Sequence, residues 1–350
     1  MPHTSSISTV SDRKIIAIWL LVCCVTIYGM IVLGGITRLT GSGLSMVQWA
    51  PIMGVLPPLN QEQWQETFAL YQQYPEYILK NHQMSLHEFK SIFWFEYSHR
   101  LLGRSIGIIF LLPFLFFLAR GKIERSMTPK LVTMFVLGGL QGLLGWYMVK
   151  SGLVDNPRVS QYRLTAHLGL AVIIYSYMLW VAFGLLFPKT DSSNSKSPLA
   201  RMALLISGLV FITILSGGFV AGTHAGYAYN TFPFMEGKLV PDGLFGLSPL
   251  WRNFFENIIT VQFDHRVLAT LVFLAIGTFW FRTRRFAASN ELPSLARTGS
   301  HLLLATMLLQ VTLGISTLLL VVPIALAAAH QAGAILLLTA SLFASWQLQR

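Results

Sequence analysis

The chain has 350 residues, of which 54% are hydrophobic and only 11% are charged, and its mean hydropathy is +0.59. A soluble domain usually carries about 25% charged residues, so this composition excludes an ordinary soluble globular protein. The formal net charge of +11 would suit a nucleic-acid partner. The positions of the charges, described below, instead indicate a lipid bilayer and no nucleic acid.

Long apolar segments dominate the chain. A helix that crosses a bilayer needs about 20 mostly apolar residues. In chain order, eight stretches reach or approach this length: 14–36, 91–119, 130–149, 163–187, 201–223, 256–281, 299–320 and 325–347. The second and the sixth carry charges in their first turns, so their prediction depends on the apolar runs that follow. The sequence therefore predicts an all-α membrane protein with eight transmembrane helices.

Two connections between the predicted helices are long, residues 37–90 and 224–255. The first contains a helix-like stretch around Gln61–Lys80. It ends in Ser85-Leu86-His87-Glu88, which has the pattern of a capping box before the second transmembrane segment. We expect the two long connections to cover the external ends of the helices.

Basic residues are concentrated on one side of the predicted topology. If the first helix starts inside, the cytoplasmic segments hold 14 Lys and Arg against 4 Asp and Glu, whereas the remainder holds 11 and 10. This asymmetry follows the positive-inside rule and places both termini in the cytoplasm. The polar stretch before the first helix is too short for a signal or transit peptide. A bacterial plasma (inner) membrane is therefore favoured over the mitochondrial inner membrane.

The chain contains an internal repeat. Four landmarks occur in the same order in its two parts: Gly34-Gly35 and Gly217-Gly218, 96–101 and 262–267, 141–145 and 310–314, and Ala166-His167 and Ala329-His330. Four helices per part give both parts the same orientation in the membrane. The prediction is therefore two pseudo-symmetric four-helix bundles, an N-terminal half of residues 1–190 and a C-terminal half of residues 191–350.

Each half contributes two histidines at a similar depth near the external face: His99 and His167, then His265 and His330. Ionisable residues inside a membrane are costly and are candidates for function. Two facing imidazoles suit the axial positions of a haem iron. Zinc usually takes three or four protein ligands, and no extra carboxylates or cysteines accompany each pair. The alternative for any single membrane histidine is an interhelical hydrogen bond.

The repeat is broken beside the first histidine of each half. Glu96 in the first half aligns with Gln262 in the second, and Glu96 shares a helix face with His99. A carboxylate there can accept a proton or stabilise positive charge that develops on a substrate. This difference predicts chemistry in the first half and a supporting cofactor in the second. The alternative is an ion pair of Glu96 with Arg100 or Arg104.

Two further residue types near these histidines have open interpretations. The glycine pairs of the first helix in each half either admit a flat macrocycle to the backbone or are ordinary membrane helix packing. Arg38, Arg100 and Arg266 either bind haem propionates, since Arg matches carboxylate geometry, or anchor helix ends. Cys23 and Cys24 are neighbours in the first helix, where a structural disulfide between them would be strained.

At these residues the sequence resembles the haem A synthase family. The resemblance is carried by residues 34–46 (GGITRLTGSGLSM), 81–84 (NHQM), 96–100 (EYSHR), 221–226 and 229–233 (YNTFP), and it extends over essentially the whole chain. It is closer to the branch shared by proteobacteria and mitochondria than to the branch with paired external cysteines. Any disulfide-based redox role of that other branch is therefore not carried over.

The resemblance implies a specific activity, the oxidation of the C8 methyl group of haem O to the formyl group of haem A by successive hydroxylations. It implies that His99 and His167 bind the substrate haem and that His265 and His330 are the axial ligands of a haem b. Glu96 matches the family's functional acid. The resemblance also implies a haem O synthase (farnesyltransferase) and cytochrome oxidase assembly factors as partners, and it leaves a homo-oligomer open.

Two other classes of protein fit part of the pattern. A di-haem b-type electron-transfer cytochrome explains the four histidines but gives the difference between Glu96 and Gln262 no role. A transporter explains the repeat, but its polar residues would lie near the middle of the membrane and not near one face. Two permanent b-type haems without haem A production would favour the cytochrome, and a colourless purified protein would favour the transporter.

Overall fold

The computed structural model describes residues 10–48, 55–153, 157, 159–188, 197–289 and 292–349, and in these ranges the chain is almost entirely helical, without a named strand. Eight of its helices are long and apolar enough to cross a membrane. They are α1 (Val10–Leu39), α4 (Leu86–Ala119), α5 (Thr128–Gly152), α6 (Gln161–Leu186), α7 (Pro198–Thr223), α9 (Ile258–Ser289), α10 (Ser294–Leu319) and α11 (Ile324–Gln349). The all-α membrane architecture with eight spans is confirmed.

Two of these helices differ from their predicted bounds for identifiable reasons. Helix α4 begins at Leu86, five residues before the predicted segment, because Ser85 caps it: Glu88 N–H donates to Ser85 Oγ at 3.3 Å, and Ser85 N–H donates to the Glu88 carboxylate at 2.8 Å. The predicted capping box is therefore present. Helix α9 begins at Ile258, where the Asn257 side chain accepts from Ile259 N–H at 3.0 Å. It continues through its basic residues to Ser289.

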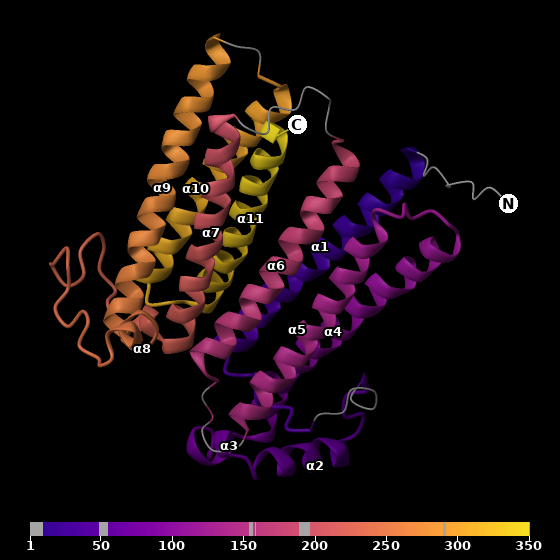
Figure 1. Cartoon of the computed structure of the whole chain (residues 1–350). Helices are drawn as coiled ribbons and strands as arrows, with labels where there is room; N and C mark the ends of the chain where they lie inside the picture. Colours follow the sequence, from indigo (N-terminus) through magenta and orange to yellow (C-terminus); the bar gives the residue numbers. More distant parts are fainter. Residues whose placement is uncertain are drawn as a thin grey trace.

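Helices α1, α4, α5 and α6 lie together, and α7, α9, α10 and α11 lie together (Figure 1). The two groups meet where α6 contacts α7 and α11, and where α1 contacts α11. Within the most apolar window of each helix, 50% of α6 is buried but only 6% of α5. Helices α1, α6, α7 and α11 therefore form the interior, and the others present apolar side chains outward, as expected for surfaces that face lipid.

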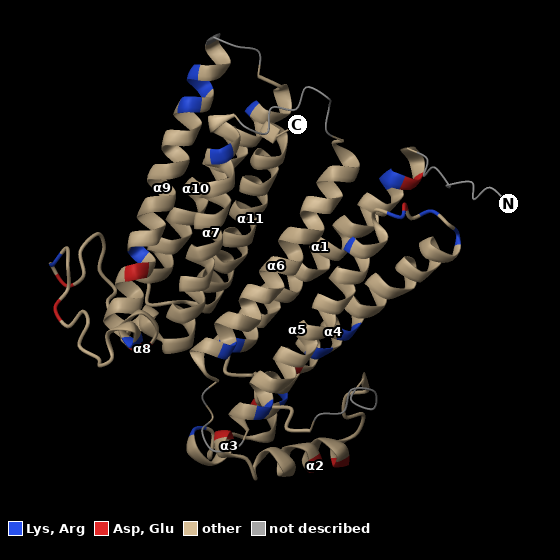
Figure 2. Cartoon of the chain, viewed as in Figure 1, with Lys and Arg blue, Asp and Glu red and all other residues tan. Residues whose placement is uncertain are grey.

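Helix α1 begins and α11 ends at the same end of the bundle, opposite the two long connections (Figure 1). Arg13 pairs with Glu124 at 2.7 Å and Lys122 with Asp12 at 3.0 Å, so the start of α1 is fixed to the turn between α4 and α5. Figure 2 shows basic residues on the part of α9 farthest from its long connection. The two ends of the described chain therefore lie at one end of the bundle, and the cytoplasmic location of that end stays a prediction.

The connection between α1 and α4 has a small aromatic core. The predicted helix-like stretch is two helices, α2 (Gln61–Tyr71) and α3 (Pro75–Leu79), because Pro75 begins a new helix at its N1 position. Aromatic side chains of α2 pack on the first turns of α4, and the buried members of this cluster are Trp64, Tyr71, Phe89, Phe93 and Tyr97. These first turns of α4 therefore extend the helix beyond the transmembrane bundle and hold the connection in place.

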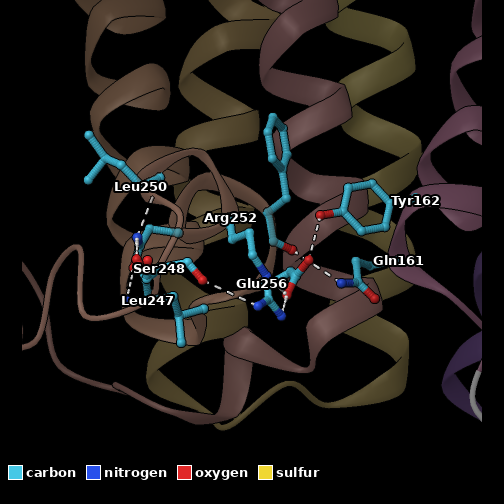
Figure 3. Close-up of polar contacts among 9 residues, drawn as sticks. Gln161, Tyr162, Leu247, Ser248, Leu250, Arg252 and Glu256 are labelled. Carbon is cyan, nitrogen blue, oxygen red and sulfur yellow. Dashed lines mark hydrogen bonds and ion pairs between the residues drawn. The ribbon is translucent and has the colours of Figure 1, made fainter.

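The connection between α7 and α9 is held by polar contacts. It contains the 3-10 helices η2 (Ala225–Tyr227) and η3 (Leu250–Arg252) and the short α8 (Asn253–Glu256). Figure 3 shows how it reaches the other group of helices: Arg252 and the Tyr162 hydroxyl of α6 both donate to the Glu256 carboxylate, at 2.6 and 2.9 Å. The start of α6 is thus fixed to the connection that follows α7.

Candidate functional site

Each of the four histidines lies against a glycine of a neighbouring helix. A Cβ added at the glycine would lie 3.0 Å or less from the imidazole Cε1 in three pairs and 3.3 Å in the fourth. The pairs are Gly34 with His99 at 3.0 Å, Gly145 with His167 at 2.9 Å, Gly217 with His265 at 3.3 Å and Gly314 with His330 at 2.8 Å. The glycines are therefore close-packing positions that accommodate the imidazole rings, which supports their interpretation as helix packing.

The second glycine of each predicted pair also serves helix packing. A Cβ at Gly35 would overlap the Gln331 side chain of α11, and one at Gly218 would lie 2.9 Å from Thr165 Oγ1 of α6. The Gln331 amide donates to the carbonyl of Ile31 at 2.9 Å. These two glycines therefore bring α1 and α7 against the fourth helix of the opposite group.

The imidazoles of His265 and His330 face each other across the second group of helices. Their ring centroids are 6.4 Å apart, and the ring planes are nearly perpendicular at 87°. Two metal–nitrogen bonds of about 2.0 Å, plus roughly 1.1 Å from nitrogen to centroid on each side, require about 6.2 Å between centroids. The separation therefore fits one iron atom bound between the two rings.

His99 and His167 occupy the corresponding positions of the first group, on α4 and α6. The Nδ1 atoms of both rings are buried and have no hydrogen-bond partner among the described residues. His99 lies 13 residues after the start of α4, about three and a half turns into the helix, because the aromatic cluster extends α4 outward.

The histidines of the fourth helices share a glutamine contact to the backbone, but the glutamine lies near Nε2 of His167 and near Nδ1 of His330. Gln141 Nε2 donates to the backbone carbonyl of His167 at 3.1 Å and lies 3.4 Å from a ring nitrogen. Gln310 Nε2 donates to the carbonyl of His330 at 3.0 Å and lies 3.1 Å from a ring nitrogen. Both glutamines belonged to the sequence repeat, but the repeat alone did not assign them to their histidines.

Glu96 is 2% exposed and its carboxylate is fully engaged. It accepts from Ser45 Oγ at 2.8 Å and from Met46 N–H at 2.6 Å, and it forms an ion pair with Arg100. The ion pair with Arg100 that the sequence allowed is therefore present. Gln262 instead donates to the carbonyl of Tyr229 at 3.0 Å. Both residues fasten the chain segment that follows the first helix of their group, one with a charge and one without.

The three arginines considered as propionate partners make contacts within the protein. Arg100 donates to the carbonyl of Met46 at 2.7 Å, and Arg266 donates to the carbonyl of Tyr229 at 2.9 Å. Arg38 at the end of α1 lies 3.0 Å from His224 Nε2 at the end of α7. His224 received no role from the sequence, because a lone histidine in a predicted loop gives no sign of a distant cationic partner. These contacts support the anchoring interpretation of the arginines.

The two histidine pairs fit the iron of a haem better than a metal ion whose ligands all come from the protein. Within the described ranges, no three His, Cys, Asp or Glu side chains lie together as a structural metal site would require. Each pair supplies two imidazoles from different helices, which leaves the equatorial positions of an iron atom to a porphyrin. The donor set of each group of helices is therefore of the kind that ligates a haem iron.

These features define the class of the protein: a helical integral membrane protein with two histidine pairs suited to haem ligation. The family model described as the COX15-CtaA cytochrome oxidase assembly protein matches residues 17–342. The chain belongs to this family.

Proteins named Heme A synthase are similar to the chain over nearly their full length. The relative from Nitrosospira multiformis is 54% identical and covers 99% of both chains, and the one from Nitrosomonas eutropha is 53% identical over 98% of this chain and 96% of its own. The human relative, named Heme A synthase COX15, is 46% identical over 99% of this chain and 86% of its own. The similarity therefore includes both bacterial and mitochondrial relatives.

Proposed function

We propose that the chain is a haem A synthase in which the first group of helices binds the substrate haem O and the second holds a resident haem b. The observation that supports this division is the pair of equivalent histidine sites with different surroundings. The reaction converts the C8 methyl group of haem O to a formyl group by two hydroxylations, followed by loss of water from the gem-diol. The chain is thus a membrane oxidoreductase.

In the second group, His265 of α9 and His330 of α11 would bind haem b as axial ligands. Their 6.4 Å separation and the close approach of Gly314 to His330 support this assignment. Haem b, when bound, supplies one-electron transfer. The residues of the chain hold the two imidazoles apart at a fixed distance and keep bulky side chains away from them, so that the coordination is rigid.

In the first group, His99 of α4 and His167 of α6 would bind the iron of haem O. Their ring nitrogens have fewer partners than those of the second pair. A substrate must enter and leave, so a less constrained ligand pair suits this group. Gly34 and Gly145 leave the space that the two imidazoles occupy.

Glu96 would act beside the substrate through its negative charge. A fixed carboxylate would lower the free energy of any state in which positive charge develops on the methyl carbon, and it could also accept a proton from the substrate. Ser45, Met46 and Arg100 hold the Glu96 carboxylate in one orientation. The same contacts keep residues 42–46 folded against α4. Glu96 therefore both fixes this segment and supplies a negative charge at the site.

The cellular setting follows from the topology. We place the chain in a bacterial inner membrane with both termini in the cytoplasm, so that the histidine pairs lie near the external face. The partners would be a farnesyltransferase that supplies haem O and assembly factors that deliver haem A to a terminal oxidase. The two halves, 1–190 and 191–350, would be the substrate half and the cofactor half.

Pigment extraction from cells that express the chain together with a source of haem O tests the proposal. Chromatography should resolve haems B, O and A, with haem A present only when the chain is expressed. The purified protein should contain haem b in all preparations. Two permanently bound b-type haems with no haem A in the cells would overturn the proposal in favour of an electron-transfer cytochrome.

A further inference from the structure

The first histidine of each pair has a different neighbour on the helix it faces. His265 Nδ1 lies 2.7 Å from Ser216 Oγ, and that hydroxyl also donates to the carbonyl of Thr213 at 2.8 Å. A hydroxyl has one proton. Because the proton of Ser216 is donated to Thr213, Ser216 accepts from His265, and the Nδ1 atom of His265 carries the hydrogen.

This hydrogen bond settles which nitrogen of His265 is available for iron. With the hydrogen on Nδ1, the lone pair is on Nε2, the atom that binds a metal on the other side of the ring. Hydrogen bonds of this kind to the outer nitrogen of a metal-bound histidine fix the tautomer, orient the ring and make the ligand more basic. Gly217 next to Ser216 lets the ring approach, since a Cβ there would lie 3.3 Å from His265 Cε1.

The first half lacks this support. Gly34 corresponds to Gly217 in the repeat, so Leu33 occupies the position of Ser216. His99 Nδ1 is buried and, in the part of the chain that the structure describes, has no hydrogen-bond partner. The fourth-helix histidines share a glutamine contact to the backbone carbonyl, but their ring contacts differ: Gln310 Nε2 lies 3.1 Å from His330 Nδ1, whereas His167 Nδ1 has no partner among the described residues. In both helix pairs the Nδ1 atom therefore has a neighbour in the second half and none in the first, and only Ser216 supplies a hydroxyl.

We infer that Ser216 is a positioning residue that makes the second site a permanent haem site, whereas Leu33 leaves the first site able to exchange its haem. This inference rests on the proposed function, in which one haem is resident and the other is a substrate. A pre-oriented, more basic imidazole binds ferric iron more tightly and releases haem more slowly. An imidazole without that hydrogen bond gives weaker coordination, which a substrate site needs for turnover.

The test compares Ser216→Ala with Ser216→Thr in the purified full-length protein. Ser216→Ala should speed the loss of haem b to excess apomyoglobin by about tenfold and raise its reduction midpoint potential, because ferric iron loses stabilisation. Ser216→Thr keeps the hydroxyl, so its rate of haem b loss and its midpoint potential should stay close to those of the wild-type protein. Equal loss rates and potentials in the wild-type and Ser216→Ala proteins would overturn the inference, as would equal effects of the alanine and threonine variants.

The reverse substitution tests the other half. Leu33→Ser places a hydroxyl beside His99 and should leave more haem O in the purified protein after washing, with haem b unchanged. Unchanged haem O retention counts against the inference. A wild-type protein without haem b would instead contradict the proposed function, so the two failures are distinguishable.

A separate observation concerns the opposite end of the second group, where α9 and α10 line an open cavity of about 260 Å³. Among the residues that the structure describes, its lining includes Arg284, Arg297 and His301 and no acidic side chain. Trp280 organises two of these groups, since Arg284 lies 5.0 Å from the ring centroid and the indole N–H donates to His301 Nδ1 at 3.1 Å. His301 therefore keeps its own N–H on Nε2 as a further donor.

Two more features of this cavity suit an anion. Thr283 lines it, is 1% exposed, and its hydroxyl has no hydrogen-bond partner among the described residues. Arg297 and Ser300 lie in the first two turns of α10, whose N-terminus favours negative charge. At the corresponding positions the first half has apolar or neutral side chains: Phe117 for Thr283, Leu118 for Arg284, Thr128 for Arg297 and Val132 for His301.

We propose that this cavity binds a phosphate group, and that the group belongs to the headgroup of an anionic phospholipid. The cavity lies at the end of membrane-spanning helices, where basic pockets between helices meet lipid headgroups. Phosphatidylglycerol added to the detergent-solubilised holoprotein should raise its melting temperature by several degrees. The double variant Arg284→Gln/Arg297→Gln should lose this response.

Three comparisons decide the source and the site. Phosphatidylcholine, which is zwitterionic, and inorganic phosphate alone should each give less than half of the shift. Arg282→Gln, on the same helix but outside the cavity lining, should respond as the wild type does. An equal shift with inorganic phosphate would overturn the lipid assignment, and an equal shift in the double variant would overturn the site.

Discussion

The two groups of helices share a framework and differ in what surrounds one histidine. Each group contains two contacts between a histidine ring and a glycine of a neighbouring helix. In each group a glutamine also donates to the backbone carbonyl of the fourth-helix histidine. Around the second-helix histidine, the first half has Glu96 and Leu33, and the second has Gln262 and Ser216. Under the proposed function, one architecture would hold haem for two purposes, with ligation set by the shared framework and reactivity by the residues around it.

The two long connections differ in a parallel way. The connection over the first half has its own aromatic core, built around Tyr71 and Phe89, both fully buried. The connection over the second half is held by polar contacts, among them the Arg252–Glu256 pair and the buried side chain of Asn253. The first connection thus has an apolar core of its own, whereas the second does not depend on one.

Removal of an axial ligand in the second half should have the largest effect. His265→Ala or His330→Ala should lower the haem b content of the purified protein at least tenfold, because the haem would lose one of its two iron–imidazole bonds. Absorption spectra of the reduced protein and haem extraction measure the loss. His87→Ala, an exposed position at the start of α4, is the control and should retain haem b. Full retention in the His265 variant would contradict the assignment.

Making the first half resemble the second at Glu96 should have the next largest effect. Glu96→Gln keeps the shape of the side chain but removes its charge, and haem A formation should fall about 100-fold while haem b stays bound. Chromatography of extracted haems gives the ratio of haem A to haem O. The matched variant Gln262→Glu should leave haem A production nearly unchanged. Wild-type haem A output from Glu96→Gln would remove the catalytic role of this carboxylate.

Replacing these glycines by alanine should weaken haem binding, and the effect should be larger where the added Cβ would lie closer to the histidine ring. Gly314→Ala places a Cβ 2.8 Å from His330 Cε1 and should lower haem b retention severalfold, whereas Gly217→Ala at 3.3 Å should have a smaller effect. Gly145→Ala should impair turnover of haem O and leave haem b in place, because Gly145 faces His167 at 2.9 Å. Haem extraction and turnover assays compare the three variants. Equal haem b loss in Gly145→Ala and Gly314→Ala would contradict the division between halves.

A smaller effect should distinguish the two connections by pH. Burial raises the pKa of Glu76, in the first connection, from 4.5 to about 7. The folded connection therefore favours the protonated carboxyl, so its stability is greatest below about pH 4.5 and falls as the pH rises through about 7. The protection of residues 61–80 from hydrogen exchange, taken relative to the intrinsic exchange rate at each pH, should be greater at pH 5.5 than at pH 8.

Glu76→Gln should remove most of this pH dependence, because a neutral amide does not titrate. Glu62→Gln, an exposed position in α2, should leave it as in the wild type. The connection of the second half behaves in the opposite way, since the Arg252 side chain lowers the pKa of Glu256. Its ion pair should be present above the usual glutamate pKa and lost only in stronger acid. Identical pH profiles for both connections would contradict this contrast.

The sequence by itself determined the eight helices and the four histidines. Apolar runs long enough for a bilayer have few alternatives to a helix, because every backbone N–H and C=O must be paired in lipid. The repeat then placed His99, His167, His265 and His330 at one depth, since helices of similar length with the same direction bring equivalent residues to equivalent heights. The capping box at Ser85 was also local, and a four-residue pattern was enough to predict it.

Only the tertiary structure decided which side chains meet. Gly314 and His330 lie 16 residues apart, but Gly34 and His99 are separated by 65, and Arg38 and His224 by 186. The tilt and rotation of each helix, which depend on packing against its neighbours, decide such contacts. Ser216 gave no signal in the sequence for the same reason: a serine in an apolar helix becomes informative only when an imidazole is found beside it.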